Sequence, residues 1–386
     1  MNAVDIINKK RLGEKLTAEE IEYMVMGYTE GVIPDYQMSS LLMAICCKGL
    51  SKEETVELTR IMKDSGDTID LSGITGPAAS GTTPPIKVDK HSTGGVGDKT
   101  TLIVAPIAAA CGVPIAKMSG RGLGFTGGTV DKMESIPGFK TTMGQDEFIK
   151  AVNTIGIAVI GQTGQIAPAD KKIYALRDVT ATTENIGLIT SSIMSKKLAA
   201  GADAIVLDVK CGGGAFMKKY EDAKELAEWM VDIGRASGKK MMALISDMNQ
   251  PLGNAVGNTL EVREAIDVLK CKGPGDITEL SINLAGAMIY LGEKAGTLGD
   301  GKKMATEALN NGSAIAKFRE FVKNQGGDPD ITEAAGISQG AGITSDPNEK
   351  KVFALEVKSE ETGYVSHLDA MGIGLASQHA GAGRQR

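Results

Sequence analysis

The 386-residue chain lacks several features that mark specialised classes of protein. No apolar run approaches the roughly 20 residues that a membrane-spanning helix needs, so we expect no membrane partner. Residues 1–5 show no basic region followed by an apolar one, which argues against a signal peptide. The sequence has no Lys/Arg run and a formal net charge of −6, so nucleic acid is not an expected partner either.

The cysteine pattern excludes two further classes. The number of cysteines is odd and no two of them show the CxxC spacing, so neither a disulfide framework nor a zinc site is expected. The five residues are Cys46, Cys47, Cys111, Cys211 and Cys271. A reducing, cytoplasmic location fits this pattern best.

Glycine, by contrast, is abundant. The chain has 49 glycines, well above the usual share of about 7%, whereas the apolar content of 42% and the charged content of 23% are ordinary for a globular protein. The glycines are clustered, which indicates tight turns and close approach of the backbone to a ligand. The length allows a large core and more than one domain.

The first 66 residues are predicted to form a small helical domain. Residues 17–20 and 51–54 both match the capping box, in which side chains satisfy the free amides of a first helical turn. Apolar residues at helical spacing follow each of them. Gly31, Gly49 and Gly66 stand where these helices should end.

After a Gly/Thr/Pro-rich loop over residues 72–85, short β-rich runs alternate with helices, as in a largely parallel sheet. Strands are predicted over 86–89, 113–118, 158–160, 204–209 and 242–246. Helices are predicted over 100–110, 145–153 and 221–236. Two more, over 169–178 and 191–200, indicate a return to the helical domain.

The predicted fold class is therefore α/β with a separate all-helical domain, built on a central mixed, largely parallel sheet flanked by helices. The helical domain would comprise residues 1–72 and 169–200. The α/β domain would comprise residues 73–168 and 201–386.

Three glycine-rich loops, over residues 90–101, 117–129 and 210–216, each follow a predicted strand. This edge of an α/β sheet is where ligands bind, and glycine lets backbone N–H groups close on an anion. Glycine in such a connection can also serve turn geometry alone. Two of the loops, however, share lysine, serine and threonine, which supply charge and further donors. We therefore favour an anion site.

The loops do not match the common nucleotide motifs. Asp98 precedes Lys99 where a Walker A motif requires glycine, and the first loop does not fit GxGxxG. A lone histidine is more often structural than catalytic, but His91 stands between Lys90 and Ser92 at a strand end. This position favours a functional role.

The run SGRGLGFTGGTVDKME over residues 119–134 resembles the signature of the thymidine/pyrimidine-nucleoside phosphorylases. The resemblance continues in VDKHSTGGVGD (88–98), APADKK (167–172) and IMSKK (193–197), and it covers nearly the whole chain. It implies reversible phosphorolysis of uridine, thymidine and deoxyuridine to the free base and (deoxy)ribose 1-phosphate. Inorganic phosphate would be the co-substrate, with no organic cofactor.

The resemblance also implies an active site in a cleft between the two domains, and a homodimer formed through the helical domain. The catalytic residues would be His91, Arg177 and Lys196. The phosphate would be held by Lys90, Ser92, Thr101, Lys117, Ser119 and Thr129. The base would be held by Arg177, Ser192 and Lys196, with Tyr174, Leu123 and Phe216 lining the apolar part of its pocket. Spacing agrees in one respect, because Ser192 and Lys196 are four residues apart and share a helix face.

A structural potassium site is implied as well. Its positions fall on Gly97, Lys99, Leu252, Ala255 and Glu264. Glu264 would supply the only anionic side chain, while backbone carbonyls, including that of Lys99, would supply the other oxygens.

The sequence departs from the family pattern in three places. Phe125 stands where the family usually has histidine. Residues 76–85 resemble an insertion. The chain ends at Arg386, so its C-terminal portion is shorter than that of family members.

Two other functions remain open at this stage. The loop from Thr93 to Asp98 also resembles that of the anthranilate phosphoribosyltransferases, which would need an acidic cluster for magnesium and diphosphate. A catalytically inactive nucleoside-binding protein is the other alternative. If the chain is a phosphorylase, Lys117 resembles the broad-specificity branch and predicts activity on uridine as well as thymidine.

Overall fold

The structure is a computed structural model that describes residues 1–77, 84–122, 127–333 and 355–382. The chain forms two compact units. The helical unit comprises Met1–Leu71, Gln162–Ile205 and Lys224–Met241. The α/β unit comprises Ser72–Gly161, Val206–Ala223 and Met242–Arg386.

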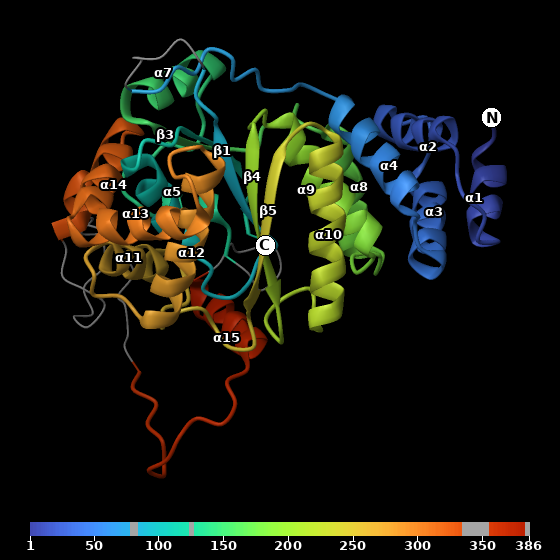
Figure 1. Cartoon of the computed structure of the whole chain (residues 1–386). Coiled ribbons are helices and arrows are strands. Elements are labelled where there is room, and N and C mark those ends of the chain that lie inside the picture. Colours follow the sequence, from blue (N-terminus) through green and yellow to red (C-terminus); the bar gives the residue numbers. More distant parts are fainter. Residues whose placement is uncertain (78–83, 123–126, 334–354, 383–386) are drawn as a thin grey trace. The chain divides into compact units, whose positions relative to one another are not determined.

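Four helices begin the helical unit: α1 (Ala3–Arg11), α2 (Ala18–Glu30), α3 (Asp35–Lys48) and α4 (Lys52–Asp64), drawn in blue in Figure 1. Both predicted capping boxes are present. Thr17 and Glu20 bond each other's backbone N–H groups at the start of α2, and Ser51 and Glu54 do so at the start of α4. Gly31 ends α2 in the left-handed conformation, at φ 85°.

The chain returns to the helical unit through α8 (Pro168–Val179) and α9 (Ile186–Ala199). Both helices pack against α4, and α8 also packs against α2 and α3. Ile173 of α8 and Leu188 of α9 join Met24, Leu42 and Leu58 in one apolar core. This core fixes the helices that carry the predicted base-binding side chains.

The α/β unit contains the carboxyl ends of the strands that the predicted glycine-rich loops follow. The strands are β1 (Val88–Ser92), β2 (Ile115–Ser119), β3 (Ile157–Gly161), β4 (Ala204–Cys211) and β5 (Lys240–Asp247). They form a three-stranded sheet of order β1-β4-β5 and a two-stranded parallel sheet of β2 and β3. The register pairs Ile115 with Ile157 and Ser119 with Gly161.

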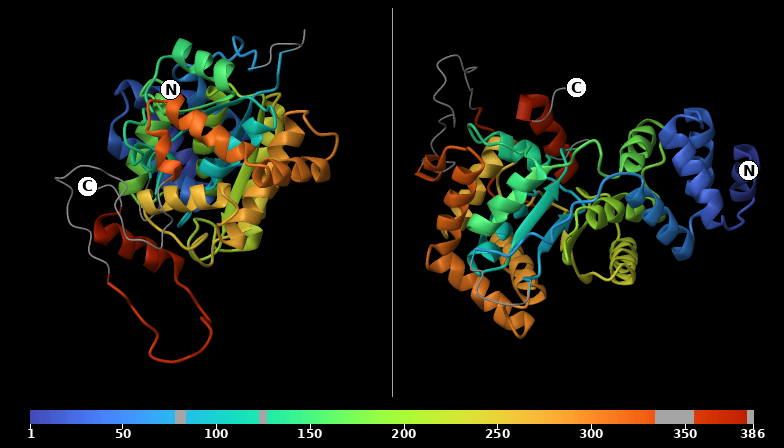
Figure 2. Two further views of the ribbon diagram at one scale, coloured as in Figure 1. Left: turned by 90° about the vertical axis from the view of Figure 1, so that its left-hand side faces the viewer. Right: turned by 90° about the horizontal axis from the view of Figure 1, so that it is seen from above.

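The helices of this unit gather around α5 (Thr100–Ala110), which is buried on nearly all sides. Those drawn in yellow to orange in Figures 1 and 2 are α11 (Asn258–Leu269), α12 (Gly275–Leu291), α13 (Leu298–Asn310) and α14 (Ser313–Asn324). All four contact α5. The remaining helical segments are α6 (Thr129–Glu134), α7 (Gln145–Ile155), α15 (Ala370–Ser377) and two short turns, Pro329–Glu333 and Gln378–Ala382.

The predicted fold class is confirmed, with two refinements. The strands that we expected in one central sheet fall into two sheets. The helix α10 (Tyr220–Ala236), which we placed in the α/β domain, lies mostly in the helical unit. Its Asp232 accepts a hydrogen bond of 2.6 Å from Lys52 of α4, a contact that periodicity cannot reveal. Within the described part of the chain, no helix is long and apolar enough to span a membrane.

Candidate active site

The end of β1 presents Lys90 and Ser92 on one face, because alternate residues of a strand point the same way. The buried Lys90 Nζ lies 2.5 Å from Thr100 Oγ1 and 3.2 Å from Asp208 Oδ2. Ser92 Oγ donates a hydrogen bond to Asp98. Two predicted phosphate-binding side chains are therefore held in one buried network.

Asp98 is the centre of this network. Its carboxylate accepts hydrogen bonds from Ser92 Oγ and from Thr100 Oγ1, the latter at 2.6 Å. Burial by itself would raise the pKa of Asp98, but the ammonium groups of Lys90, Lys210 and Lys132 and the Ser92 hydrogen bond together hold that pKa well below its ordinary range. The carboxylate is therefore ionised, and it fixes the hydroxyl groups of Ser92 and Thr100.

The lowered pKa predicts a pH effect. A group whose pKa is depressed by folding stabilises the protein above its unfolded pKa, about 4 for aspartate, and that contribution is lost as the pH falls. The unfolding free energy of Asp98→Asn should therefore lie below that of the parent by a constant amount from about pH 5 to 8. Urea unfolding should show the two proteins converging as the pH falls below about 4. A gap of unchanged size at pH 3 would contradict this role of Asp98.

Lys132 connects the first two glycine-rich loops. Its Nζ donates hydrogen bonds to the carbonyl of Asp98, at 2.8 Å, and to that of Gly127, at 2.9 Å. The same ammonium forms a buried ion pair of 3.0 Å with Glu261 of α11. The loops that the sequence predicted separately are thus fixed to each other and to one helix.

The third loop joins at the end of β4. The backbone N–H of Thr93 donates to the carbonyl of Asp208 at 3.1 Å, and that of Lys210 donates to Thr93 Oγ1 at 2.9 Å. The Lys210 ammonium pairs with Asp208 Oδ2 at 2.8 Å. Phe216 is 40% exposed, and a Cβ added to Gly94 would lie 3.8 Å from its ring. All three loops therefore meet in the α/β unit.

The other predicted phosphate-binding residues lie around these loops. Lys117 Nζ is 3.2 Å from Asp89 and donates to the Lys90 carbonyl. Thr101 is buried in the first turn of α5. Ser119 ends β2 and Thr129 begins α6, and the two ends lie close together, with Val130 N 3.5 Å from the carbonyl oxygen of Gly120.

His91 lies on β1 between Lys90 and Ser92 and is partly exposed. Strand alternation directs its side chain to the face opposite theirs. Leu123 and Phe125 lie outside the described residues, as does most of the expected insertion at residues 76–85.

The helical unit holds the predicted base-binding residues. Lys196 of α9 donates a hydrogen bond to Ser192 Oγ at 2.9 Å and another to Asp170 of α8. Its Nζ lies 5.6 Å from the centroid of the Tyr174 ring, within the range of a cation–π contact. The Lys196 side chain is 21% exposed, and its ammonium is oriented by these contacts.

Arg177 is more deeply buried. Three of its five N–H groups donate to the backbone carbonyls of Thr182, Thr183 and Leu188, at 2.8 to 3.1 Å. Burial lowers the pKa of the guanidinium, while the nearby Asp170 opposes that change. Arg177 thus holds the turn between α8 and α9 in addition to any contact with a ligand.

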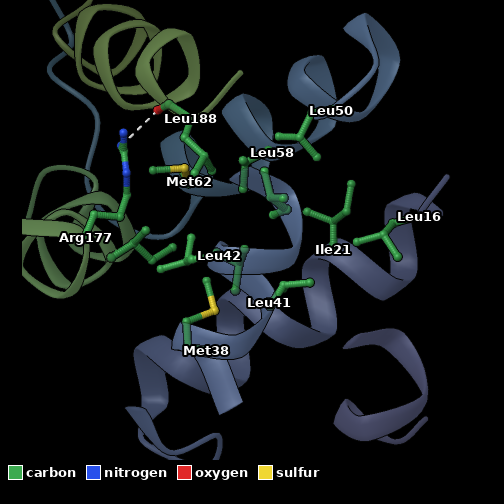
Figure 3. A pocket seen from close by; sticks show the side chains of 13 residues that line it. Leu16, Ile21, Met38, Leu41, Leu42, Leu50, Leu58, Met62, Arg177 and Leu188 are labelled. Atoms are coloured by element: carbon green, nitrogen blue, oxygen red, sulfur yellow. Dashed lines mark hydrogen bonds between the residues drawn. The ribbon is translucent and has the colours of Figure 1, made fainter. Parts of the chain in front are cut away.

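An apolar cavity beside Arg177 is not large enough for a base. Its volume of about 20 Å³ corresponds to little more than one water molecule. Figure 3 shows leucine, isoleucine and methionine side chains around it, with the Arg177 guanidinium pointing away toward the Leu188 carbonyl. We interpret it as a packing gap in the helical core.

The five residues of the implied potassium site also lie close together, but Lys99 contributes its side chain and not the expected backbone carbonyl. The side chain of Lys99, rather than its carbonyl, points at the Leu252 and Ala255 carbonyls and at Glu264. Gly97 packs against the same two carbonyls. This arrangement does not fit a potassium ion in addition, because the ammonium already contacts the oxygens that would bind it.

Sequence reasoning missed several residues of these networks. Asp98, Lys132 and Asp170 stood inside the family motifs but were not singled out. Asp208 and Lys210 could have been found from the sequence, because two charged residues in an otherwise apolar, buried strand require charged or polar partners. Among the described residues, no group of three His, Cys, Asp or Glu side chains could hold a metal ion.

Comparison with protein families agrees with this arrangement of two units. Residues 4–66 match the helical bundle domain of a glycosyl transferase family, and residues 84–315 match its α/β domain. The chain belongs to this family.

Its relatives include pyrimidine-nucleoside phosphorylases, which confirms the resemblance of residues 119–134. The chain is 56% identical over 386 residues to the enzyme of Geobacillus stearothermophilus and 55% identical over 386 residues to that of Bacillus subtilis. Each alignment covers 100% of this chain and 84% of the relative.

A solved structure shares the fold at much lower identity. It is the anthranilate phosphoribosyltransferase of Thermus thermophilus, with a TM-score of 0.63 and 20% identity over 83% of this chain and 99% of that one. At this identity the likeness supports the fold alone.

Proposed function

We propose that the chain is a pyrimidine-nucleoside phosphorylase, which converts a pyrimidine nucleoside and phosphate into the free base and (deoxy)ribose 1-phosphate. The observation that carries the proposal is the 53–56% identity, over essentially the whole chain, to enzymes that are named for this activity. The geometry adds one buried lysine network on the glycine-rich loops and a second cationic cluster on α8 and α9.

The base-side cluster suits the departure of a pyrimidine. When phosphate displaces the base from C1′, negative charge develops on the ring and its carbonyl oxygens. A cation aimed there stabilises the transition state more than the substrate. We assign this role to Lys196 and to the two N–H groups of Arg177 that do not donate to the turn. Asp170 and Ser192 position the Lys196 ammonium, and Tyr174 supplies an apolar wall.

The phosphate-side cluster suits an oxyanion. In this proposal the phosphate is bound by Lys90, Ser92, Thr101, Ser119 and Thr129. Lys117 donates a hydrogen bond to the Lys90 carbonyl and so fixes the backbone at Lys90. The carboxylates of Asp208 and Glu261 form ion pairs with the neighbouring lysines and fix them in place, so that little reorganisation is needed when phosphate arrives. His91 donates a hydrogen bond or a proton to the leaving base. We assign no potassium ion, because Lys99 occupies its oxygens.

The proposal is tested by incubating the protein with uridine, with and without phosphate, and separating the products chromatographically. Uracil should appear only when phosphate is present. Release of uracil at the same rate without phosphate would indicate a hydrolase and would overturn the proposal. Reaction only with 5-phosphoribosyl diphosphate would favour the phosphoribosyltransferase alternative.

We predict broad base and sugar specificity, including uridine, thymidine and 2′-deoxyuridine. The prediction rests on the resemblance of Lys117 to the broad-specificity branch of the family, and since the Lys117 ammonium contacts Asp89 and the Lys90 carbonyl, we propose that it acts on the sugar site through Lys90. The measurement is kcat/KM for uridine and thymidine under identical conditions. Turnover of thymidine with no detectable turnover of uridine would show that the specificity is wrong.

We also propose that the chain is a homodimer formed by the helical unit. Most apolar residues of α2 and α3 are buried within the unit, but Val32 and Tyr36 are each 73% exposed, and Met43 is 43% exposed. Large exposed apolar side chains near one another in sequence are what a subunit interface on this unit would need. Sedimentation at micromolar concentration should give twice the chain mass of 40.3 kDa.

Two tyrosine variants test the dimer prediction, one at the expected interface and one as its control. Tyr36→Glu should shift the equilibrium toward the monomer. Tyr220→Glu, at a 58% exposed tyrosine of the α/β unit, should not. A parent protein that sediments as a monomer would contradict the prediction.

A further inference from the structure

The ammonium of Lys99 lies in a cage of oxygen atoms inside the α/β unit. It donates to the Leu252 carbonyl at 3.0 Å, to the Ala255 carbonyl at 2.8 Å and to the carboxylate of Glu264. A lysine ammonium has three N–H donors, so these three acceptors satisfy it completely. The Lys99 side chain is 0% exposed.

The oxygens are fixed independently of Lys99. The Glu264 carboxylate accepts hydrogen bonds from the backbone N–H of Asn254, at 2.8 Å, and from that of Ala255, at 3.2 Å. It therefore keeps its place at the base of the cage. Two backbone carbonyls and one carboxylate are ligands that a hard cation prefers, and the single negative charge matches a single positive one.

Two glycines allow the backbone to close around the ammonium. Gly97 has φ 75°, and a Cβ there would lie 2.6 Å from the Leu252 carbonyl oxygen. Gly253 has φ 70°, and a Cβ there would lie 2.3 Å from the Glu264 carboxylate and 3.2 Å from Lys99 Nζ. Both glycines thus have a positive φ that other residues rarely adopt and a close approach that a side chain would prevent.

We propose that the Lys99 ammonium takes the place of a bound monovalent cation, so that this chain carries the cation of the site covalently. A second cation cannot share the cage. Two unit positive charges at contact distance inside a protein repel each other strongly, and among the described residues no carboxylate other than that of Glu264 pairs with the ammonium to offset this. Structural integrity of this region should therefore be independent of potassium.

Because of where the cage lies, the Lys99 ammonium connects three segments of the α/β unit. Lys99 directly precedes α5 and lies in the first glycine-rich loop, whose Val96 carbonyl accepts a hydrogen bond of 3.0 Å from Leu252 N. The ammonium therefore ties this loop to the 252–255 segment and, through Glu264, to α11. A covalent cation holds these three segments together at any ionic composition, whereas a bound ion would do so only above its dissociation constant.

The test compares thermal unfolding in potassium chloride with unfolding in tetramethylammonium chloride at equal ionic strength, since the organic cation is too large for the cage. For the parent protein the unfolding midpoint should not rise with potassium concentration. Elemental analysis after gel filtration into potassium-free buffer should find no stoichiometric potassium. A saturable rise in the parent midpoint, or about one potassium per chain, would overturn the inference.

Two variants add a positive control. Lys99→Thr removes the ammonium and leaves space and a hydroxyl oxygen in the cage, so Glu264 becomes an unpaired buried charge. The unfolding midpoint of Lys99→Thr should fall by roughly 5–10 °C in tetramethylammonium chloride and should rise again, saturably, as potassium is added. Lys99→Met also removes the charge but fills the space, so it should lose a similar amount without recovery. If Lys99→Thr shows no more potassium dependence than Lys99→Met, the cage is not a cation site and the inference fails.

Discussion

Replacing Lys196 by alanine is expected to lower kcat for uridine phosphorolysis by about 10²–10³, with a much smaller change in the KM for phosphate. The reason is that the ammonium, held by Asp170 and Ser192, gains most of its interaction energy as the leaving base becomes anionic. The measurement is steady-state kinetics on protein whose circular dichroism and unfolding midpoint show that it is folded.

A substrate series separates this electrostatic role from simple loss of structure. 5-Fluorouracil carries negative charge more readily than uracil, so the Lys196→Ala defect should be smaller with 5-fluorouridine than with uridine. Lys224→Ala, at a 58% exposed lysine of the helical unit, is the matched control and should keep the parental kcat. A Lys196→Ala variant with near-parental kcat would show that the base site is assigned wrongly.

Replacing Lys90 by methionine is expected to have two effects of different origin. The substitution leaves Asp208 and Asp98 without one of their buried partners, which typically costs about 3–5 kcal/mol of unfolding free energy. The variant also loses a charge-assisted hydrogen bond to phosphate, worth about 1.5–3 kcal/mol, so the phosphate KM should rise roughly 10- to 100-fold.

The two effects can be separated with a second substitution. Adding Asp98→Asn to Lys90→Met removes one of the two carboxylates that lost Lys90, while Asp208 keeps Lys210 as its partner, so part of the lost stability should return while the phosphate KM stays high. If the double variant also regained the parental phosphate KM, Lys90 would be a structural residue rather than a phosphate ligand. Urea unfolding and initial-rate kinetics on the parent protein and the two variants decide this.

Much of the fold could be predicted because local signals agreed with the tertiary structure. The capping boxes at Thr17 and Ser51 mark the starts of α2 and α4, and the helix predicted over 100–110 has the observed bounds of α5. The return of α8 and α9 to the helical unit followed from a change of apolar period. These features depend on residues close in sequence.

The buried polar networks could not be predicted in the same way. Asp208 lies on β4, far in sequence from Lys90, yet the two form an ion pair of 3.2 Å. Lys132 joins Asp98 to Glu261 across three elements. At Lys99, family resemblance implied a backbone ligand of a potassium ion. Only the fold shows that the side chain reaches the oxygens 153–165 residues away in sequence.

The most direct test of the proposed function is to follow phosphate itself during the reaction with uridine. Phosphorus-31 NMR of an incubation containing protein, uridine and inorganic phosphate should show phosphate disappearing as ribose 1-phosphate appears, mole for mole with uracil. Addition of excess uracil and ribose 1-phosphate should regenerate uridine and phosphate, because the reaction is reversible. Uracil formed while the phosphate resonance stays constant, or no uracil at all, would contradict the assignment.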